Sequence, residues 1–363
     1  VCPAESRARS AVIAPHFCFS HQQTTDFPFH SRAVGIKIGP FVVQTSREEQ
    51  RDSKMSMTRK LGFNLLLMLS LSFPFSSTRA QTAALPETLA RAVEISRRYM
   101  VEANITYITA NNYEAKLDVY RPRDLTQPNP VVIFIHGGGW VAGTKEGSAL
   151  ELLPYLMMGF SVVNVEYRLA RVSLAPAAVE DCRCALQWVI RNAERYKFDT
   201  NKIVVTGMSA GGHLALMTGM LPAAAGLDRQ CSGTTDMKVA AIINWYGITD
   251  VNDLLDGPNM KGYAVVWLGS QINRDEIARR VSPLTYVRAG LPPILTIHGD
   301  ADPTVPYNHA VRLHQALDRA GVPNQLLTIP GGKHGGFNAA ETQRIYATIR
   351  DFLARYNLLP PGQ

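Results

Sequence analysis

Ser209 lies in a sequence motif that indicates chemical reactivity. It lies in Gly207-Met208-Ser209-Ala210-Gly211-Gly212, between an apolar, β-branched run and a segment with helical character. A G-x-S-x-G motif at a strand-to-helix turn exposes the serine hydroxyl and brings the N–H groups of the helix N-terminus close to it. This pattern is typical of a serine nucleophile, although the motif alone also fits a glycine-rich turn with a solvated serine.

A second glycine-rich stretch, His136-Gly137-Gly138-Gly139-Trp140, follows the apolar run Val131–Ile135. Successive glycines leave backbone N–H groups free to bind an anion, such as the oxyanion that forms during acyl transfer. A flexible loop is the alternative. A phosphate-binding P-loop is disfavoured, because Gly-Lys-Ser/Thr does not follow at the required spacing. We expect His136 to anchor the loop rather than to act as a base.

A serine nucleophile needs a base, and the base needs a carboxylate that orients it. His334 follows the last predicted strand, and Asp302 follows the strand before it. With Ser209 they give the chain order Ser…Asp…His, which is the order of α/β-hydrolases. Asp300 and Asp250 are the alternatives for the carboxylate, and Asp302 is favoured because Pro303 follows it in the pattern H-G-x-x-D-x-x-V-P.

These residues need a scaffold that brings the ends of several strands together. Apolar runs rich in Val and Ile alternate with helical patterns, which predicts a mostly parallel sheet with helices on both faces. Ligands bind beyond the carboxyl ends of such strands. The predicted strands are 117–120, 131–135, 160–167, 203–206, 239–244, 294–298 and 325–329. The predicted helices are 81–100, 177–196, 307–320 and 341–356, and residues 248–291 form an excursion typical of a short lid.

From about residue 105 to 356 the chain resembles α/β-hydrolases of the esterase and lipase group that carries an H-G-G-G loop, similar to hormone-sensitive lipase. Within this group it resembles the secreted acetylxylan and feruloyl esterase domains of the BD-FAE type. The motifs around Gly138, Ser209 and Asp302 carry the resemblance. They are specific for the fold and for serine hydrolysis, but only weakly specific for the substrate.

The resemblance implies a catalytic triad of Ser209, Asp302 and His334, without a metal or an organic cofactor. It also implies an oxyanion hole formed by the N–H groups of Gly138, Gly139 and Ala210. Structural roles are expected for His213, in the nucleophile turn, and for Arg168, in a neighbouring loop. An aromatic pocket is one reading of the following side chains, and packing in the core or lid is the favoured one: Trp140, Tyr246 and Trp267.

The N-terminal region has the composition of an export signal. Basic residues at 59 and 60 precede an apolar run over 61–75, and small or polar residues lead to Ala80. We expect a signal peptide at 55–80 with cleavage near Ala80, and an exported enzyme at 81–363. The apolar run is shorter than the roughly 20 residues of a spanning helix. Residues 1–54 show no periodicity, and we interpret them as a non-native or disordered leader.

The charge of the chain bears on nucleic-acid binding, and its cysteine content bears on disulfide bonding. Residues 1–80 hold ten Lys/Arg and five Asp/Glu, so the formal charge falls from +7 for the whole chain to +2 beyond them. This balance does not favour nucleic-acid binding. Beyond the leader, the three cysteines Cys182, Cys184 and Cys231 allow one disulfide and leave one thiol. Cys182 and Cys184 point to different sides of a helix, so we do not expect them to pair.

We therefore predict a secreted serine hydrolase that cleaves carboxylic esters of short acyl groups, with a small-molecule or polysaccharide-linked substrate. An amidase, peptidase or arylformamidase-like activity is the alternative on the same core. A catalytically inactive binding module is disfavoured, because the serine, the histidine and the oxyanion glycines are all present. The sequence leaves the acyl group, the alcohol and the oligomeric state open.

Overall fold

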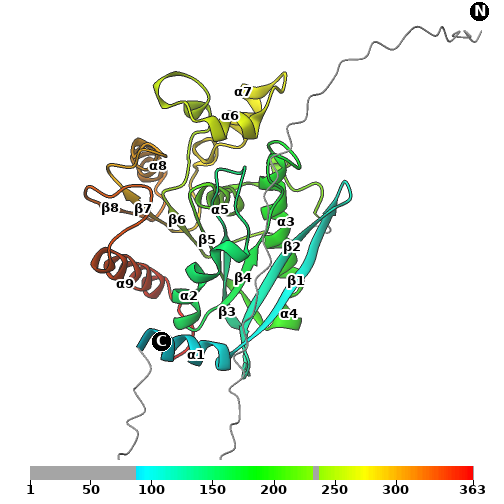
Figure 1. Cartoon of the computed structure of the whole chain (residues 1–363), viewed down its shortest axis with the longest axis vertical. Coiled ribbons are helices and arrows are strands. Elements are labelled where there is room, and N and C mark those ends of the chain that lie inside the picture. Colours follow the sequence, from blue (N-terminus) through cyan, green and yellow to red (C-terminus); the bar gives the residue numbers. More distant parts are fainter. Residues whose placement is uncertain (1–86, 232–236, 363) are drawn as a thin grey trace, which may run out of the picture. The chain divides into compact units, whose positions relative to one another are not determined.

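The computed structural model describes residues 87–231 and 237–362. The predicted leader at 1–54 and the predicted signal peptide at 55–80 lie outside these residues. An eight-stranded sheet forms the centre of the described part (Figure 1). Its strands are β1 (Tyr99–Ala110), β2 (Tyr113–Pro122), β3 (Asn129–Ile135), β4 (Ser161–Val165), β5 (Phe198–Met208), β6 (Ala241–Trp245), β7 (Ile294–Gly299) and β8 (Asn324–Ile329).

The order of the strands across the sheet is β1-β2-β4-β3-β5-β6-β7-β8. β1 and β2 pair antiparallel, and so do β2 and β4, whereas every pair from β4 to β8 is parallel. The predicted mostly parallel sheet is thus confirmed. Because β5, β7 and β8 run in the same direction, their carboxyl ends lie on the same side of the sheet. The segments that follow these ends carry Ser209, Asp302 and His334.

The parallel strands are buried on both faces, and their side chains alternate between two hydrophobic cores. In β3, Val131, Ile133 and Ile135 belong to one core, while Val132 and Phe134 belong to the other. Helices α3, α5 and α8 cover the first core, and α2 and α9 cover the second. The longer helices are α1 (Glu87–Arg98), α3 (Ala177–Arg191), α5 (Ala210–Met220), α8 (Asn308–Arg319) and α9 (Ala339–Arg355). The short helices are α2 (Leu153–Met157), α4 (Ala193–Tyr196), α6 (Gly262–Leu268) and α7 (Arg274–Arg280).

The sequence prediction was wrong about β1, which forms a hairpin with β2 at the sheet edge, whereas the strand expected over 117–120 is part of β2. A helix was expected over 81–100, but α1 ends at Arg98 and β1 begins at Tyr99. β1 is largely exposed and its register with β2 shifts twice, so no sustained two-residue period marks it. Asn111 and Asn112 form the turn with φ of 50° and 64°. Two residues with positive φ are typical of a tight hairpin turn, and the Asn-Asn pair was the available signal.

Two further predictions need smaller corrections. The helix expected over 177–196 is split into α3 and α4 at Asn192, whose side-chain amide donates to the carbonyl oxygen of Trp188 at 2.8 Å. The backbone of Asn192, with φ of −99° and ψ of 10°, is no longer helical, and α3 ends before it. The strand expected over 203–206 is the final part of β5, which starts at Phe198.

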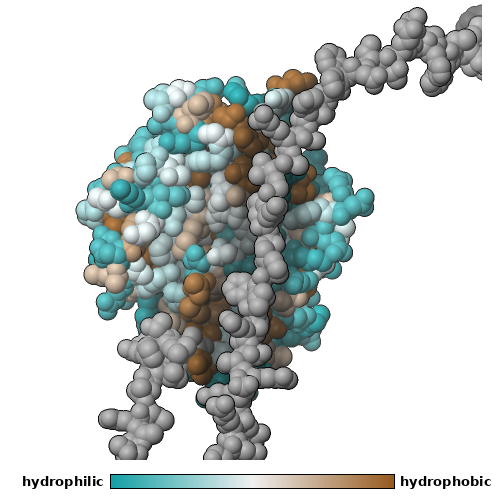
Figure 2. Space-filling model, in the orientation of Figure 1, coloured by the Kyte–Doolittle hydropathy of each residue, from teal (hydrophilic) through white to brown (hydrophobic). Residues whose placement is uncertain are grey.

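The predicted excursion between β6 and β7 contains α6, α7 and three short 3-10 helices, and no strand among its residues, all of which are described. Figure 2 shows apolar surface near α6 and α7. Exposed side chains in this segment include Met260, Val266 and Ile272. None of the helices in the described ranges is long and apolar enough to cross a membrane.

Candidate active site

Ser209 occupies a strained turn between β5 and α5. Its φ of 57° and ψ of −120° are rare for a residue with a side chain, and such strain is common at functional sites. The Ser209 N–H donates to the carbonyl oxygen of Trp245 at 2.9 Å, which fixes the turn against β6. A Cβ on Gly211 would lie 2.1 Å from the carbonyl oxygen of Ile135. Glycine at this position therefore allows α5 to start directly against the end of β3.

The structure brings Ser209, His334 and Asp302 together in one hydrogen-bonded row. His334 Nε2 lies 2.8 Å from Ser209 Oγ, and His334 Nδ1 lies 2.7 Å from Asp302 Oδ2. A carboxylate only accepts hydrogen bonds, so Nδ1 carries a proton and the neutral ring presents the Nε2 lone pair to the serine hydroxyl. This arrangement can transfer a proton from the serine to the histidine.

Asp302 is held as a carboxylate by four donors. Its Oδ1 accepts from the N–H groups of Thr304 at 2.7 Å and Val305 at 3.0 Å. Its Oδ2 accepts from His334 and, at 3.1 Å, from His298 Nε2. Burial acts to raise the pKa of Asp302, but the hydrogen bonds from His298, His334 and Val305 outweigh it and hold the pKa well below its usual range. The carboxylate therefore stays charged beside His334.

The two alternative carboxylates have other partners. Asp250 Oδ2 pairs with the guanidinium of Arg312 at 2.7 Å, and Asp300 Oδ1 accepts from the N–H of Gly331 at 2.6 Å. Among the described residues, neither carboxylate makes a hydrogen bond or an ion pair with His334. The geometry thus favours Asp302 as the residue that orients this histidine.

The glycine loop after β3 lies beside the serine, since a Cβ on Gly137 would be 3.5 Å from Ser209 Cβ. Gly138 has a φ of 115°, and a Cβ there would lie 2.0 Å from the carbonyl oxygen of Ala142. Within the described ranges, the N–H groups of Gly138, Gly139 and Ala210 have no protein acceptor. These donors are available to an oxyanion.

His136 anchors the glycine loop, as its position suggested. The buried ring stacks on Tyr167 with the ring centroids 4.3 Å apart, and Nδ1 donates to the carbonyl oxygen of Gly137 at 2.7 Å. Burial lowers the pKa of His136 to about 4, so the imidazole is neutral near pH 7. Arg168 has the expected structural role as well, because its guanidinium binds both carboxylate oxygens of the buried Asp181.

The aromatic residues separate into packing and site positions. Trp140 and Trp267 are fully buried and stacked at 4.0 Å, which confirms packing roles. Trp140 Nε1 donates to His213 Nδ1 at 3.2 Å, and His213 Nε2 donates to the carbonyl oxygen of Val281 at 2.6 Å, so His213 ties the nucleophile helix to the excursion. The ring of Tyr246 lies 4.6 Å from that of His334 and therefore borders the site.

The excursion also contacts the two loops of the site directly, as expected of a lid, but the residues that make these contacts were not predicted. A Cβ on Gly139 would lie 2.9 Å from Tyr263 Cβ, so this side chain of α6 closes over the glycine loop. The Tyr263 hydroxyl donates to the carbonyl oxygen of Thr304 at 3.1 Å, and Lys261 Nζ donates to that of Pro303 at 2.9 Å. The excursion thus holds the loop that carries Asp302.

Cys184 and Cys231 form a disulfide, and Cys182 is a buried free thiol. The expectation of one disulfide that does not join Cys182 to Cys184 is confirmed. Within the described ranges, no group of three His, Cys, Asp or Glu side chains is arranged to hold a metal ion.

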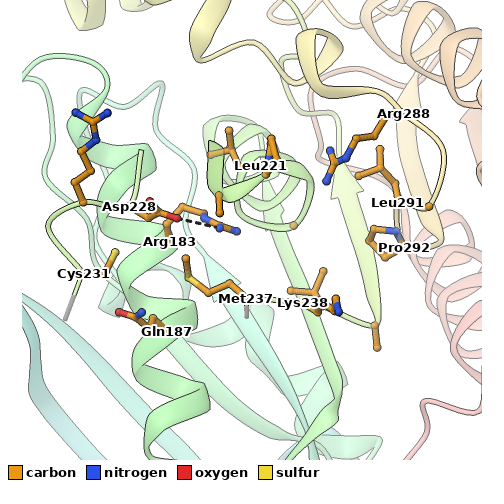
Figure 3. Close-up of a pocket in the computed structure, with 17 residues that line it drawn as sticks. Arg183, Gln187, Leu221, Asp228, Cys231, Met237, Lys238, Arg288, Leu291 and Pro292 are labelled. Carbon is orange, nitrogen blue, oxygen red and sulfur yellow. Dashed lines mark hydrogen bonds and ion pairs between the residues drawn. The ribbon is translucent and has the colours of Figure 1, made fainter. Parts of the chain in front are cut away.

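A separate cavity of about 670 Å³ lies where β6 and β7 begin (Figure 3). Ser209 follows the opposite, carboxyl end of the parallel strands. Arg183 and Arg288 line it, but both guanidinium groups donate to backbone carbonyls of α5, at Thr218 and Met220. They neutralise the negative carboxyl-terminal end of this helix. Their charges have a structural role, so they do not indicate an anion-binding site.

Comparison with known proteins places the chain in a family. The family model described as BD-FAE matches residues 117–317. The chain belongs to the BD-FAE family. Like a truncated carbohydrate esterase from gut microbiota, this BD-FAE protein has the α/β-hydrolase fold; the two are 28% identical with a TM-score of 0.62, over 71% of this chain and 97% of the other. The fold predicted from the motifs is confirmed.

Other similar proteins are also esterases. Esterase 2 of Thermogutta terrifontis, solved phosphoramylated by tabun, is 27% identical with a TM-score of 0.60, over 73% of this chain and 97% of that one. Esterase LipC of Mycobacterium tuberculosis is 30% identical over 249 residues, which are 66% of this chain and 60% of LipC. The BD-FAE chain thus spans about three fifths of the length of this relative.

Proposed function

We propose that this protein hydrolyses carboxylic esters of short acyl groups through an acyl-enzyme on Ser209. The observation that carries the proposal is the row of hydrogen bonds from Asp302 through His334 to Ser209, at 2.7 and 2.8 Å. Membership of a family with esterase relatives supports the same reaction class.

The mechanism follows from these contacts. Ser209 Oγ attacks the ester carbonyl carbon as its proton passes to His334 Nε2, and the carbonyl oxygen becomes an oxyanion. The N–H groups of Gly138, Gly139 and Ala210 stabilise this charge, and each such donor is typically worth about 3 kcal/mol. The ester C–O bond then breaks, and His334 returns the proton to the leaving alcohol.

Water completes the cycle. His334 removes a proton from water, the hydroxide attacks the acyl-enzyme, and the carboxylic acid leaves as Ser209 recovers its proton. Asp302 keeps its charge because its pKa is low, so it stabilises the imidazolium in both half-reactions. It also keeps the Nδ1 proton in place, and Nε2 remains the atom that exchanges protons with serine, alcohol and water.

Short acyl groups are favoured by the way the excursion packs. Tyr263 lies against Gly139, and the stacked Trp140 and Trp267 fill the space behind the glycine loop. We expect Tyr263, backed by these rings, to form a wall that limits the length of an acyl chain bound at Ser209. Esterase 2 of Thermogutta terrifontis, a relative of similar fold, has been solved with propionate bound.

Export through a signal peptide at residues 55–80, with cleavage near Ala80, is part of this proposal. The disulfide between Cys184 and Cys231 supports it, because such bonds persist mainly in oxidising compartments. A protein expressed from Met55 or Met57 should be recovered outside the cytoplasm with its N-terminus near Gln81. Active native protein that retains residues 1–54 would contradict this part of the proposal.

Activity assays test the reaction and the substrate class together. The wild type should hydrolyse p-nitrophenyl acetate and butyrate with higher kcat/KM than the palmitate, and folded Ser209→Ala should lose this activity. Acetylated xylan and methyl ferulate test polysaccharide-linked substrates. Hydrolysis of peptide or formamide substrates without hydrolysis of any ester would favour an amidase instead.

A further inference from the structure

His298 is a buried histidine beside the row of Ser209, His334 and Asp302 that the mechanism above does not use. It lies in β7 and is fully buried. Its Nε2 is 3.1 Å from Asp302 Oδ2 and 3.1 Å from the carbonyl oxygen of Val305. Both neighbours accept hydrogen bonds only, so Nε2 carries the proton and donates.

The other ring nitrogen of His298, Nδ1, is buried and has no hydrogen-bond partner in the described part of the chain. An unpaired buried polar atom is costly, and a phenylalanine would fill the space without it. The aromatic neighbours Tyr307 and Tyr246, at 5.6 and 6.4 Å between ring centroids, would pack against a phenyl ring equally well. The feature that distinguishes histidine here is the Nε2 donor.

We infer that His298 is a positioning residue that orients the carboxylate of Asp302 and weakens the hydrogen bond between this carboxylate and His334. The inference rests on the proposed function, because it assigns His298 a role in that reaction. Asp302 Oδ2 accepts from both rings, so its negative charge is shared between two donors. Removing one donor leaves a more basic oxygen for the other, and His334 then holds its proton more tightly.

Other groups near Asp302 stay in place when His298 is replaced. The N–H groups of Thr304 and Val305 still bind Oδ1, so the carboxylate remains anchored on one side. Tyr246 lies against His334, Tyr263 donates to Thr304, and Lys261 donates to Pro303 in the same loop. Among the described residues, the other titratable or charged groups that face this site include His334, Tyr246, Tyr263, Tyr307 and Lys261.

Two substitutions separate the donor from the packing. His298→Phe keeps a ring and removes the donor, while the side-chain amide of His298→Gln reaches the same point as Nε2 and can donate to Oδ2. We expect His298→Phe to lower kcat about tenfold with little change in KM, because the carboxylate is less well oriented. The acid limb of kcat/KM should move up by ~0.5 pH unit. His298→Gln should restore most of kcat and return the limb toward its wild-type position.

A third variant tests whether His298 acts through Asp302. The double variant His298→Phe/Asp302→Asn should be no less active than Asp302→Asn alone, since Asp302→Asn already removes the carboxylate that His298 positions. Additive losses would contradict the inference. So would a folded His298→Phe with wild-type kcat and an unmoved acid limb, or a His298→Gln that behaves like His298→Phe.

A measurement on the wild type keeps the inference testable if His298→Phe does not fold. In ¹⁵N-histidine NMR spectra at neutral pH, His298 should be protonated on Nε2 and not on Nδ1; the opposite tautomer would overturn the inference. Ser209→Ala separates the two claims. If that variant stays active, the proposed function fails; if it is inactive while His298→Phe matches the wild type, only the role of His298 fails.

Discussion

Removing the disulfide between Cys184 and Cys231 should cost a large part of the stability of this fold. The bond joins α3 to the loop that follows α5, across 47 residues of sequence. For a loop of this length, the chain-entropy relation gives about 14 cal/mol/K, or about 4 kcal/mol at 25 °C. Since globular domains are stable by roughly 5–15 kcal/mol, the Cys184→Ala/Cys231→Ala variant should unfold about 10 °C below the wild type.

Denaturant unfolding with and without reductant measures this contribution. Followed by tryptophan fluorescence, the wild type should lose about 4 kcal/mol of unfolding free energy on reduction, and the double variant should not respond to reductant. Cys182→Ala is the matched control, because it removes a buried thiol and keeps the crosslink. The reasoning is refuted if the wild type, shown by peptide mapping to be oxidised at Cys184 and Cys231, unfolds at the same midpoint in both conditions.

Three other predictions concern the site and its surroundings. Asp302→Asn should leave the fold intact and reduce kcat by about 10⁴, as the same replacement of the triad carboxylate does in serine proteases. Asp300→Asn and Asp250→Asn should keep most of the activity. Measurements of kcat and of thermal unfolding on the three variants check this. A dead Asp250→Asn beside an active Asp302→Asn would reverse the assignment. Tyr263→Ala should raise kcat/KM for longer p-nitrophenyl esters relative to acetate, and an unchanged chain-length profile would exclude the proposed wall. Burial lowers the pKa of His213 to about 4, whereas an unfolded histidine titrates near 6.5, so the unfolded state takes up a proton first as the pH falls. Wild-type stability should therefore drop from about pH 6.5 toward pH 4, by on the order of 3 kcal/mol from this residue. His213→Phe should be less stable at pH 7, but its free energy of unfolding, measured with urea, should fall less steeply between pH 6.5 and pH 4 than that of the wild type. An equally steep fall would contradict the assignment.

Burial on both faces explains why most of the sheet could be predicted from the sequence. The parallel strands are continuous apolar runs, as in Val131–Ile135, and short glycine-rich or polar segments follow them. The same rule identified Ser209 and His334 as candidate site residues, because each follows the carboxyl end of a strand, and the structure places them within hydrogen-bond distance. β1 was not predicted, because it is largely exposed and therefore lacks the apolar pattern on which the prediction depends.

Contacts between distant segments could not be predicted in this way. The sequence allowed one disulfide, but the partner of Cys231 depends on how the loop after α5 returns to α3. Three carboxylates were candidates to orient His334. Which of them faces the histidine depends on contacts with distant residues, such as the ion pair between Arg312 and Asp250. Nothing in the sequence around Tyr263 indicated that it packs on the glycine loop.

Covalent labelling with a fluorophosphonate probe tests the central claim most directly, because the probe reacts with a serine only when a base activates it. Wild-type protein should gain one probe molecule on Ser209, in the tryptic peptide Ile203–Arg229, and should lose esterase activity in proportion to labelling. Folded Ser209→Ala should gain none. An enzyme that hydrolyses esters while Ser209 stays unlabelled, or a Ser209→Ala variant that keeps the activity, would contradict the account.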